Sequence, residues 1–424
     1  MGYKLSDLKK MSNVTITEYL TPKYVYIPLA SGKDDNVTTF VKKGDYVAIG
    51  TVLGKRKGIN KVPIHSSVSG HVVGIVKKLY VTGEMVRCVK IENDGKENYI
   101  EPLTKKKLTQ YTKESFLETI LDMGVVGLGG KGFPTYIKYN TDKKIHTLIV
   151  NAVECEPYIT SDTALMMEKC EEILETVDAI MEINHIDCAM IAVSKSNTEL
   201  IHKLNKFIGT YLNIKVKVVP NIYPMGWERN LVRELCHTNY NDIPVEKGIV
   251  VNNVSTIFAI YEALKYHKPM IERVVTFAGD GLKKPCNVRI KIGTLAKDVI
   301  ASCIGYQSVE EVQLVAGGPF MGSGLTNDNL ALSPEVNCVL ALPYEKEESI
   351  LPCIRCGKCA TVCPAKLNPT GIDKAYRKKD LKKLKQLEVE RCIGCGLCSY
   401  ICPSNRNVRK QIALAKQRLR EEEK

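Results

Sequence analysis

The stretch CIRCGKCATVCP, from Cys353 to Pro364, decides the fold of the C-terminal part of this chain. It reads C-x2-C-x2-C-x3-C-P, and CIGCGLCSYICP, from Cys392 to Pro403, repeats it with every cysteine 39 positions further on. Such a duplication is typical of a module with two four-iron clusters, because three cysteines of one loop wrap one cluster and the fourth reaches the other. The two expected ligand sets are Cys353, Cys356, Cys359 and Cys402, and Cys392, Cys395, Cys398 and Cys363.

Zinc is the alternative for paired C-x2-C elements, but a structural zinc site needs four ligands and not eight. Gly357, Gly394 and Gly396 favour iron-sulfur clusters, because a backbone packed against cluster sulfides needs residues without a side chain. Residues 371–386, between the quartets, predict one basic connecting helix. Seven of the other eight cysteines are interpreted as small apolar residues in a reducing compartment. Cys155, between two glutamates, is either an inert small side chain or a residue that tunes or shields a pocket.

The composition of the 424 residues is that of a folded protein, with 44% hydrophobic and 25% charged residues. This length predicts two or three domains besides the cluster module. No run approaches the roughly 18 apolar residues of a membrane-spanning helix, and the first residues lack the pattern of a secretory signal. We therefore expect a protein of the cytoplasm without a transmembrane segment.

The formal charge of +13 is concentrated at the cluster end, where residues 372–424 hold 15 Lys and Arg against 7 Asp and Glu. A solvated helical face is one explanation, and a surface that attracts an acidic electron carrier or anionic lipid headgroups is the other. Nucleic acid is not an expected partner, because neither aromatic stacking positions nor a recognition motif accompanies the charge.

A glycine-rich loop lies upstream in MGVVGLGGKGFPTYIK, from Met123 to Lys138. Its glycines would let the backbone turn tightly and present N–H groups to a phosphate, although such loops also occur as plain connections. The next segment, KKIHTLIVNAVECEPYIT, predicts a strand over 145–150 that ends in polar residues. Strand ends are where open α/β sheets bind ligands, so Asn151, Glu154 and Glu156 are candidates to contact a flavin or a nucleotide. Alternatively, the two carboxylates cap a helix that starts near Ser161.

With these residues in view, GLGGKGFPT followed by NAVECEPY resembles the flavin- and NADH-binding fold of the 51-kDa subunit of respiratory complex I. The order of segments along the chain is more similar to a sister family, the C subunit of the Rnf electron-transport complex. That family joins the same fold to an N-terminal barrel and a C-terminal double-cluster ferredoxin.

The resemblance implies FMN and NAD(H) in the middle of the chain, with Phe133 and Glu156 as the catalytic residues beside the nicotinamide. The segment IYPMGWERNLV places Glu228 as the counterpart of a glutamate that flanks the flavin. The candidate cofactor-binding residues are Gly127, Gly129, Gly130, Gly132, Lys138, Asn151, Glu154, Glu228, Asn252 and Asn253.

The remaining segments complete a predicted α/β multidomain fold. Residues 24–79 resemble a biotinyl/lipoyl-type barrel sandwich without an acceptor lysine, in which His65 and His71 are expected to be loop residues and not ligands. Residues 272–322 resemble the small β-grasp domain that follows the flavin fold. The expected domains are a barrel sandwich over 1–100, a Rossmann-like FMN/NADH-binding domain over 101–268, a β-grasp domain over 269–335 and a double 4Fe-4S module over 336–424.

These features predict a peripheral, NADH-handling subunit at the cytoplasmic face of a membrane complex that transfers electrons between ferredoxin and NAD, coupled to ion transport. Its cofactors would be FMN, NAD(H) and two 4Fe-4S clusters, and its partners the other subunits of an Rnf-type complex, with ferredoxin reached indirectly. One alternative is a flavin-dependent cobalamin reductase. Another is an electron-relay subunit without flavin, an interpretation that Val153 keeps open because the complex I subunit has an acidic residue there.

Overall fold

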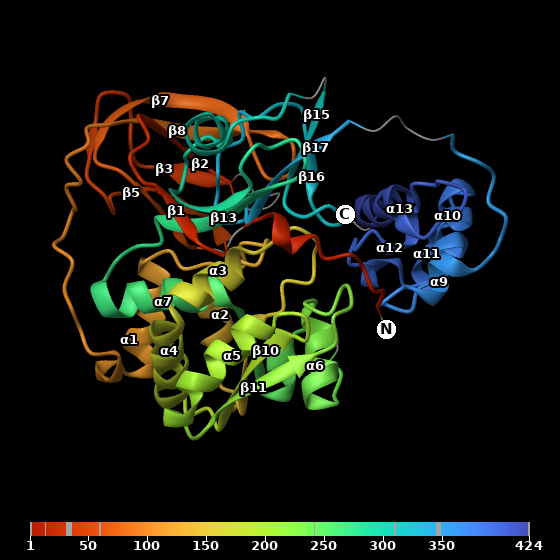
Figure 1. Ribbon diagram of the computed structural model, residues 1–424, viewed down its shortest axis with the longest axis horizontal. Helices are drawn as coiled ribbons and strands as arrows, with labels where there is room; N and C mark the ends of the chain where they lie inside the picture. Colours follow the sequence, from red (N-terminus) through yellow and green to blue (C-terminus); the bar gives the residue numbers. More distant parts are fainter. Residues whose placement is uncertain are drawn as a thin grey trace.

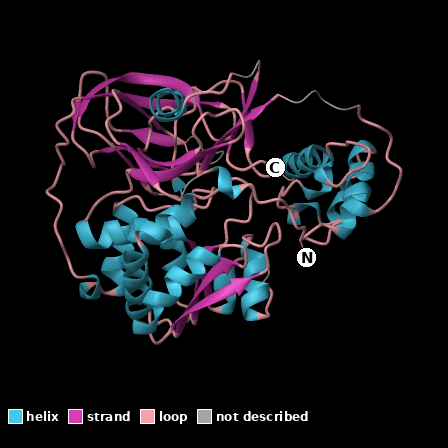
Figure 2. Ribbon diagram, viewed as in Figure 1, coloured by secondary structure: helices cyan, strands magenta, loops and turns pink. Residues whose placement is uncertain are grey.

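The computed structural model describes residues 2–12, 14–30, 36–58, 61–240, 242–308, 311–344 and 349–422. Figure 1 shows a β-rich region, a layered α/β region below it and a separate helical module beside both. Figure 2 shows that the strands gather mainly in the β-rich region, whereas the lower region is mostly helical. The first residues of the chain run along the junction where all three regions meet.

The N-terminal region is built from two small sheets that face each other across an apolar core. Strand order is β2-β8-β7-β4 in one sheet and β3-β5-β6 in the other, and Val25, Leu53 and Ile91 are fully buried between them. The predicted loop positions of the two histidines are wrong, because His65 ends β6 and His71 lies in β7. The strands are β2 (Tyr24–Pro28), β3 (Val37–Thr39), β4 (Tyr46–Val47), β5 (Val52–Arg56), β6 (Pro63–His65), β7 (Gly70–Leu79) and β8 (Met85–Asn93).

The α/β region contains a parallel sheet of four strands in the order β11-β10-β9-β12. Residues 148–150 of β9 are buried, as expected for a central parallel strand covered on both faces. The strand begins two residues later than predicted and continues through Asn151, so its polar end still belongs to the sheet. The strands are β9 (Thr147–Ala152), β10 (Cys188–Ser194), β11 (Ile214–Val219) and β12 (Ile249–Asn253).

Helices pack around this sheet through apolar stripes of helical spacing. In α4, residues Ile173, Val177 and Ile180 recur at intervals of three or four and are fully buried. Asn253 caps α7 by accepting the N–H of Ser255 at 3.0 Å, which ties the start of this helix to the end of β12. The helices are α1 (Lys113–Asp122), α2 (Thr135–Tyr139), α3 (Ser161–Glu168), α4 (Cys170–Ile183), α5 (Thr198–Phe207), α6 (Glu228–Cys236) and α7 (Val254–Tyr266).

A mixed sheet of six strands, in the order β1-β14-β13-β17-β15-β16, follows the α/β region and packs with α8 (Ala296–Val299). It takes β1 from the beginning of the chain and includes β17, which lies beyond residue 335. The domain limits stay a prediction, and we propose that the cluster module begins after β17. The strands are β1 (Ile16–Tyr19), β13 (Glu272–Ala278), β14 (Cys286–Lys291), β15 (Val312–Ala316), β16 (Ser323–Leu325) and β17 (Cys338–Pro343).

The C-terminal module is helical and has its own core, in which Ile372, Leu384 and Ile412 are buried. The single connecting helix predicted over 371–386 is wrong, because α10 ends at Arg377 and α11 starts at Leu381. Asp380 caps α11 by accepting the N–H of Lys383 at 2.9 Å. Within the described residues, no helix is long and apolar enough to cross a membrane. The helices are α9 (Lys358–Thr361), α10 (Pro369–Arg377), α11 (Leu381–Gln386), α12 (Leu397–Tyr400) and α13 (Val408–Glu422).

Candidate functional site

Three asparagines mark the carboxyl ends of the neighbouring strands β9 and β12. Asn151 lies directly opposite Asn253 in the parallel register, so their side chains meet at one edge of the sheet. The Asn151 amide donates to the carbonyl of Gly226 at 2.9 Å. Asn252 is almost fully buried and donates to the hydroxyl of Tyr139. The structure therefore brings these predicted residues together where an α/β sheet binds its ligand.

The glycine-rich loop is closed by hydrogen bonds within its own backbone. The N–H of Gly127 donates to the carbonyl of Phe133 at 2.7 Å, and the N–H of Gly132 donates to the carbonyl of Gly127 at 3.1 Å. The N–H of Leu128 donates to the hydroxyl of Thr256 on α7 at 2.9 Å. These bonds hold the loop against the start of α7, next to the strand ends.

The tip of the loop presents backbone donors to open space. Among the described residues, the N–H groups of Gly129, Gly130 and Lys131 have no hydrogen-bond partner. Gly130 has φ of +100°, and a Cβ added there would meet nothing within 4 Å. Gly129 faces Asn253, whose Cβ would lie 3.5 Å from an added Cβ. Unpaired N–H groups at a loop tip that contains two glycines fit the phosphate of a flavin nucleotide.

Lys138 lies between the loop and the strand ends. Its ammonium donates to the carbonyl of Val251 at 2.6 Å and to the side-chain oxygen of Asn252 at 3.4 Å. Burial lowers the pKa of Lys138, and the carboxylate of Glu228 opposes that shift. Glu228 accepts the hydroxyl of Tyr240 at 2.9 Å from the start of α6. A lysine and a glutamate from different elements thus share one polar site with the asparagines.

Glu154 does not face this polar site. Its two carboxylate oxygens accept the N–H groups of Asp162 and Thr163 at 2.8 and 2.9 Å, at the start of α3. Burial and the neighbouring Asp162 carboxylate raise the pKa of Glu154 to about 6. For Glu154, helix capping, which the sequence left as the alternative, is the arrangement in the structure, and a direct flavin contact is not supported.

Glu156 reaches away from α3 toward residues 317–322, which we call the GGPFMG loop after their sequence. Its carboxylate accepts the N–H groups of Phe320 and Met321 at 3.0 and 3.3 Å. Burial raises its pKa, and the two N–H groups oppose the shift. A Cβ at Gly318 would come within 2.1 Å of the carboxylate, so a side chain there would force the carboxylate or the loop to move. Phe133 is 44% exposed on the glycine-rich loop, and no hydrogen bond joins it to Glu156 among the described residues.

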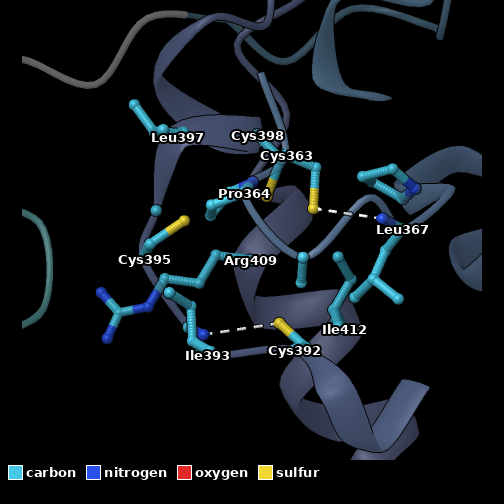
Figure 3. Close-up of a pocket in the computed structure, with 14 residues that line it drawn as sticks. Cys363, Pro364, Leu367, Cys392, Ile393, Cys395, Leu397, Cys398, Arg409 and Ile412 are labelled. Atoms are coloured by element: carbon cyan, nitrogen blue, oxygen red, sulfur yellow. Dashed lines mark hydrogen bonds between the residues drawn. The ribbon is translucent and has the colours of Figure 1, made fainter. Parts of the chain in front are cut away.

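The eight cysteines line two pockets, one for each predicted quartet. Figure 3 shows the first pocket, into which the thiols of the second cysteine loop and of Cys363 point. Backbone N–H groups of Leu367 and Gly394 donate to the sulfurs of Cys363 and Cys392, each at 3.4 Å. Among the described residues, no three Cys, His, Asp or Glu are placed to hold a single metal ion. Four thiols around a larger space, supported by N–H···S bonds, fit a four-iron cluster.

The two pockets differ in their exposure to solvent. The inner pocket, lined by the second quartet, includes Cys395, which is only 9% exposed and lies against the rest of the molecule. The outer pocket includes Cys353 and Cys356, which are both exposed. The inner pocket is lined by Cys363, Cys392, Cys395 and Cys398, and the outer one by Cys353, Cys356, Cys359 and Cys402.

Residues 223–228, with the sequence YPMGWE, connect the inner pocket to the strand ends. The hydroxyl of Tyr223 donates to the carbonyl of Cys395 at 2.8 Å. Three residues later, the N–H of Gly226 donates to the sulfur of Cys155 at 3.3 Å, while its carbonyl accepts from Asn151. Trp227 packs against the core of the helical module. One short segment therefore touches both candidate cofactor sites.

The GGPFMG loop makes a second connection at the same junction. The ring of Phe320 lies 4.8 Å from that of Tyr223 and 5.2 Å from that of Tyr400. Arg409, which lines the inner pocket, donates to the carbonyls of Phe320 and Met321 at 2.7 and 3.4 Å. The predicted set of site residues missed these groups, although aromatic residues beside glycines in both segments were a signal of close packing.

Comparison with known proteins agrees with this arrangement. Three family models match the chain: the RnfC barrel sandwich hybrid domain over residues 1–96, the Nuo51 FMN-binding domain over 120–262 and the 4Fe-4S dicluster domain over 347–403. These matches confirm the predicted barrel-sandwich, flavin-type and two-cluster architecture, and with it FMN and 4Fe-4S clusters as cofactors.

Relatives of known function match over most of the chain. The C subunit of the Na(+)-translocating ferredoxin:NAD(+) oxidoreductase complex of Acetobacterium woodii is 33% identical, over 83% of this chain and 81% of that protein. The C subunit of the proton-translocating complex of Clostridium ljungdahlii is 32% identical, over 88% and 82%. Among solved structures, an NAD+-reducing NiFe-hydrogenase has a TM-score of 0.53 and 18% identity over 73% of this chain and 63% of that one, which shows the fold alone.

Proposed function

The chain belongs to the RnfC family, the C subunits of ion-translocating ferredoxin:NAD oxidoreductase complexes, and we propose that it is the subunit in which electrons pass between NAD(H) and the iron-sulfur clusters of such a complex. The order of its parts follows from their chemistry. A nicotinamide moves two electrons as a hydride, whereas a four-iron cluster moves one. FMN, when bound, accepts a hydride and releases electrons singly, so its site must lie between the other two.

The residues around the strand ends have distinct roles in this proposal. The free N–H groups of residues 129–131 bind the FMN phosphate, and Lys138 supplies positive charge beside them. Asn151 and Asn253 orient the flavin at the carboxyl edge of the sheet, opposite Glu228. Of the two predicted nicotinamide contacts, Phe133 offers an exposed ring. The carboxylate of Glu156 is held in position by the N–H groups of Phe320 and Met321.

The observation that carries the proposal is the segment 223–228. It starts at a hydrogen bond to the cluster ligand Cys395 and reaches Gly226, whose carbonyl accepts from Asn151 of the flavin site. A short segment that touches both sites keeps them near each other, and single-electron transfer depends on that proximity. The inner quartet is therefore the first cluster after the flavin, and the outer quartet is the second.

The position in the cell is part of the same proposal. We place the chain at the cytoplasmic face of the membrane, held there by the other subunits of the complex. Ion translocation is assigned to the assembled complex, in which this chain contributes the NAD(H) half-reaction. Ferredoxin exchanges electrons with the same complex.

An anaerobic titration of the purified chain with NADH tests the central claim. Flavin absorbance should bleach, and an electron paramagnetic resonance signal from a reduced cluster should follow when its potential allows. Extraction should release FMN in a ratio near one per chain. A chain that holds eight irons but no flavin, and that does not respond to NADH, would instead be a relay subunit.

The order of the two clusters is tested by matched cysteine variants. In Cys356→Ala the outer cluster is lost, and electrons from NADH should still reach the inner cluster. In Cys395→Ala the inner cluster is lost, and the flavin should be reduced while the outer cluster stays oxidised. The reverse pattern of cluster signals would mean that the assigned order is wrong.

A further inference from the structure

We propose that the exposed loop around the outer cysteine quartet is the docking site for an acidic redox protein that exchanges electrons with this chain. The inference rests on the proposed function, because it assigns a partner to the outer cluster, the last redox group in the proposed order. It concerns residues 349–358, with the sequence SILPCIRCGK, which we call the outer loop.

The outer loop is unusually open for a segment that carries cluster ligands. Every residue from 351 to 358 is exposed, including two of the four cysteines. Ile350, Leu351 and Ile354 are 67%, 53% and 66% exposed, so three large apolar side chains surround the ligands. Large apolar residues gathered on a surface are typical of a protein-protein contact and not of free solvent exposure.

Basic residues dominate the segments around the outer loop, although Glu345, Glu347 and Glu348 precede it in the sequence. No Asp or Glu occurs from 349 to 372 or from 391 to 420, the segments that supply the cysteines of both quartets. Arg355 and Lys358 are exposed and form no ion pair among the described residues. Asp373, the acid that lines the outer pocket, is neutralised by Arg377 and Arg406 at 3.0 and 2.8 Å.

An apolar centre with exposed Arg355 and Lys358 beside it, unpaired within the described part of the chain, favours an acidic partner. A complementary surface has an apolar centre and an acidic rim, and opposite charges speed the encounter of two proteins. The exposed cluster ligands lie at the centre of this surface, so a docked protein with its own redox group would face the outer cluster directly. A surface of anionic lipid headgroups would also bind the basic residues, but it would not exchange electrons with the cluster at the centre of the loop.

Electron transfer from a small acidic ferredoxin tests the proposal on the full chain with its clusters loaded. The reduced 2Fe-2S centre of a plant-type ferredoxin gives up one electron, and the oxidised chain takes up that electron, without any bond being formed. Rapid freeze-quenching followed by electron paramagnetic resonance monitors loss of the 2Fe-2S signal. No NADH is present, so the result does not depend on the nicotinamide or flavin assignment.

The charge is tested with the double variant Arg355→Glu and Lys358→Glu. At low ionic strength, the second-order rate should fall at least about tenfold, and its dependence on salt should become weaker. The control is Lys42→Glu with Lys43→Glu, an exposed basic pair in the barrel region, which should leave the rate unchanged. Equal losses in both double variants would mean a general charge effect and would overturn the assignment.

The apolar centre is tested with Ile350→Glu, which does not touch a ligand. The matched control is Leu212→Glu, because Leu212 is a lone apolar side chain that is 92% exposed on the α/β region. Only the first variant should slow the transfer, with the cluster spectrum and iron content unchanged in both. Wild-type rates in Ile350→Glu would overturn the proposal. So would binding to phosphatidylglycerol vesicles that is lost in the outer-loop variants while ferredoxin transfer is not.

Discussion

At the scale of single residues, Glu156 is the group whose role is most open to a direct test. Replacement by Gln keeps an oxygen that can accept the N–H of Phe320 but removes the charge. We expect kcat/KM for NADH to fall at least about tenfold, which corresponds to ~1.4 kcal/mol of lost transition-state stabilisation. Dithionite-reduced cluster signals should be those of the wild type. Unchanged NADH kinetics would show that Glu156 has no part in the nicotinamide site.

Gly318 offers a second test of the same carboxylate without changing it. Alanine at this position would place its Cβ 2.1 Å from the Glu156 oxygen, so the carboxylate or the loop must move. We expect Gly318→Ala to lower the free energy of unfolding by about 1–3 kcal/mol and to reduce NADH oxidation. Gly324→Ala is the control, because an added Cβ meets nothing within 4 Å and the residue has no positive φ. Similar effects of both changes on NADH oxidation would contradict this account.

At the scale of the elements, His65 connects the end of β6 to the turn after α1. It is 8% exposed, and its ring would lie 3.1 Å from a Cβ added at Gly124. Burial lowers the pKa of His65 from 6.5 to about 4. Because the folded-state pKa lies below the unfolded one, the stability linked to neutral His65 is complete above pH 6.5 and is lost as the pH falls toward 4.

This linkage predicts a pH-dependent junction between the barrel and the α/β region. On going from pH 7 to pH 5, the wild type should lose about 2 kcal/mol more of its unfolding free energy than His65→Gln does. Urea unfolding at the two pH values measures the difference. His71→Gln is the control, since His71 is exposed in β7 and should behave as the wild type does. A pH dependence that is the same in all three proteins would mean that His65 is not buried as a neutral ring.

Elements also show what sequence reasoning can and cannot reach. The cysteine spacing predicted two quartets, and the same two groups of cysteines line the two pockets, because residues within one short loop are held together by local geometry. The strand-end position of Asn151 followed from an apolar run with a polar end. In contrast, the hydrogen bond from Tyr223 to Cys395 joins residues 172 positions apart. No local pattern encodes such a contact, and the choice between capping and ligand binding for Glu154 likewise depended on where α3 begins.

At the scale of the whole molecule, Trp227 reports on the docking of the cluster module. It is the only tryptophan and packs against the module core, where a nearby cluster should quench its fluorescence. Arg409→Gln removes the charged donor to Phe320, a type of bond worth about 1.5–3 kcal/mol. We expect Trp227 emission to rise at a lower urea concentration in this variant than in the wild type.

A neighbouring side chain provides the control for that experiment. Lys410→Gln removes an exposed charge next to Arg409 without touching the GGPFMG loop. Its urea profile should superimpose on that of the wild type. If Arg409→Gln also superimposed, the docking of the module would have to rest on its other contacts, such as the packing of Phe320 on Tyr223 and the hydrogen bond from Tyr223 to Cys395.

The pairing of strand β1 with a strand far along the sequence affects how the protein folds during its synthesis. The hydrogen-bonding partner of β1 is β14, which is made some 270 residues after it. Until then the six-stranded sheet cannot be completed, and a nascent chain must carry Ile16–Tyr19 without this partner strand until β14 has been made. Conversely, a chain shortened by its first 20 residues would expose β14 as a bare sheet edge, a surface that invites self-association. Light scattering of such a shortened protein during refolding should therefore reveal aggregates that the full chain does not form.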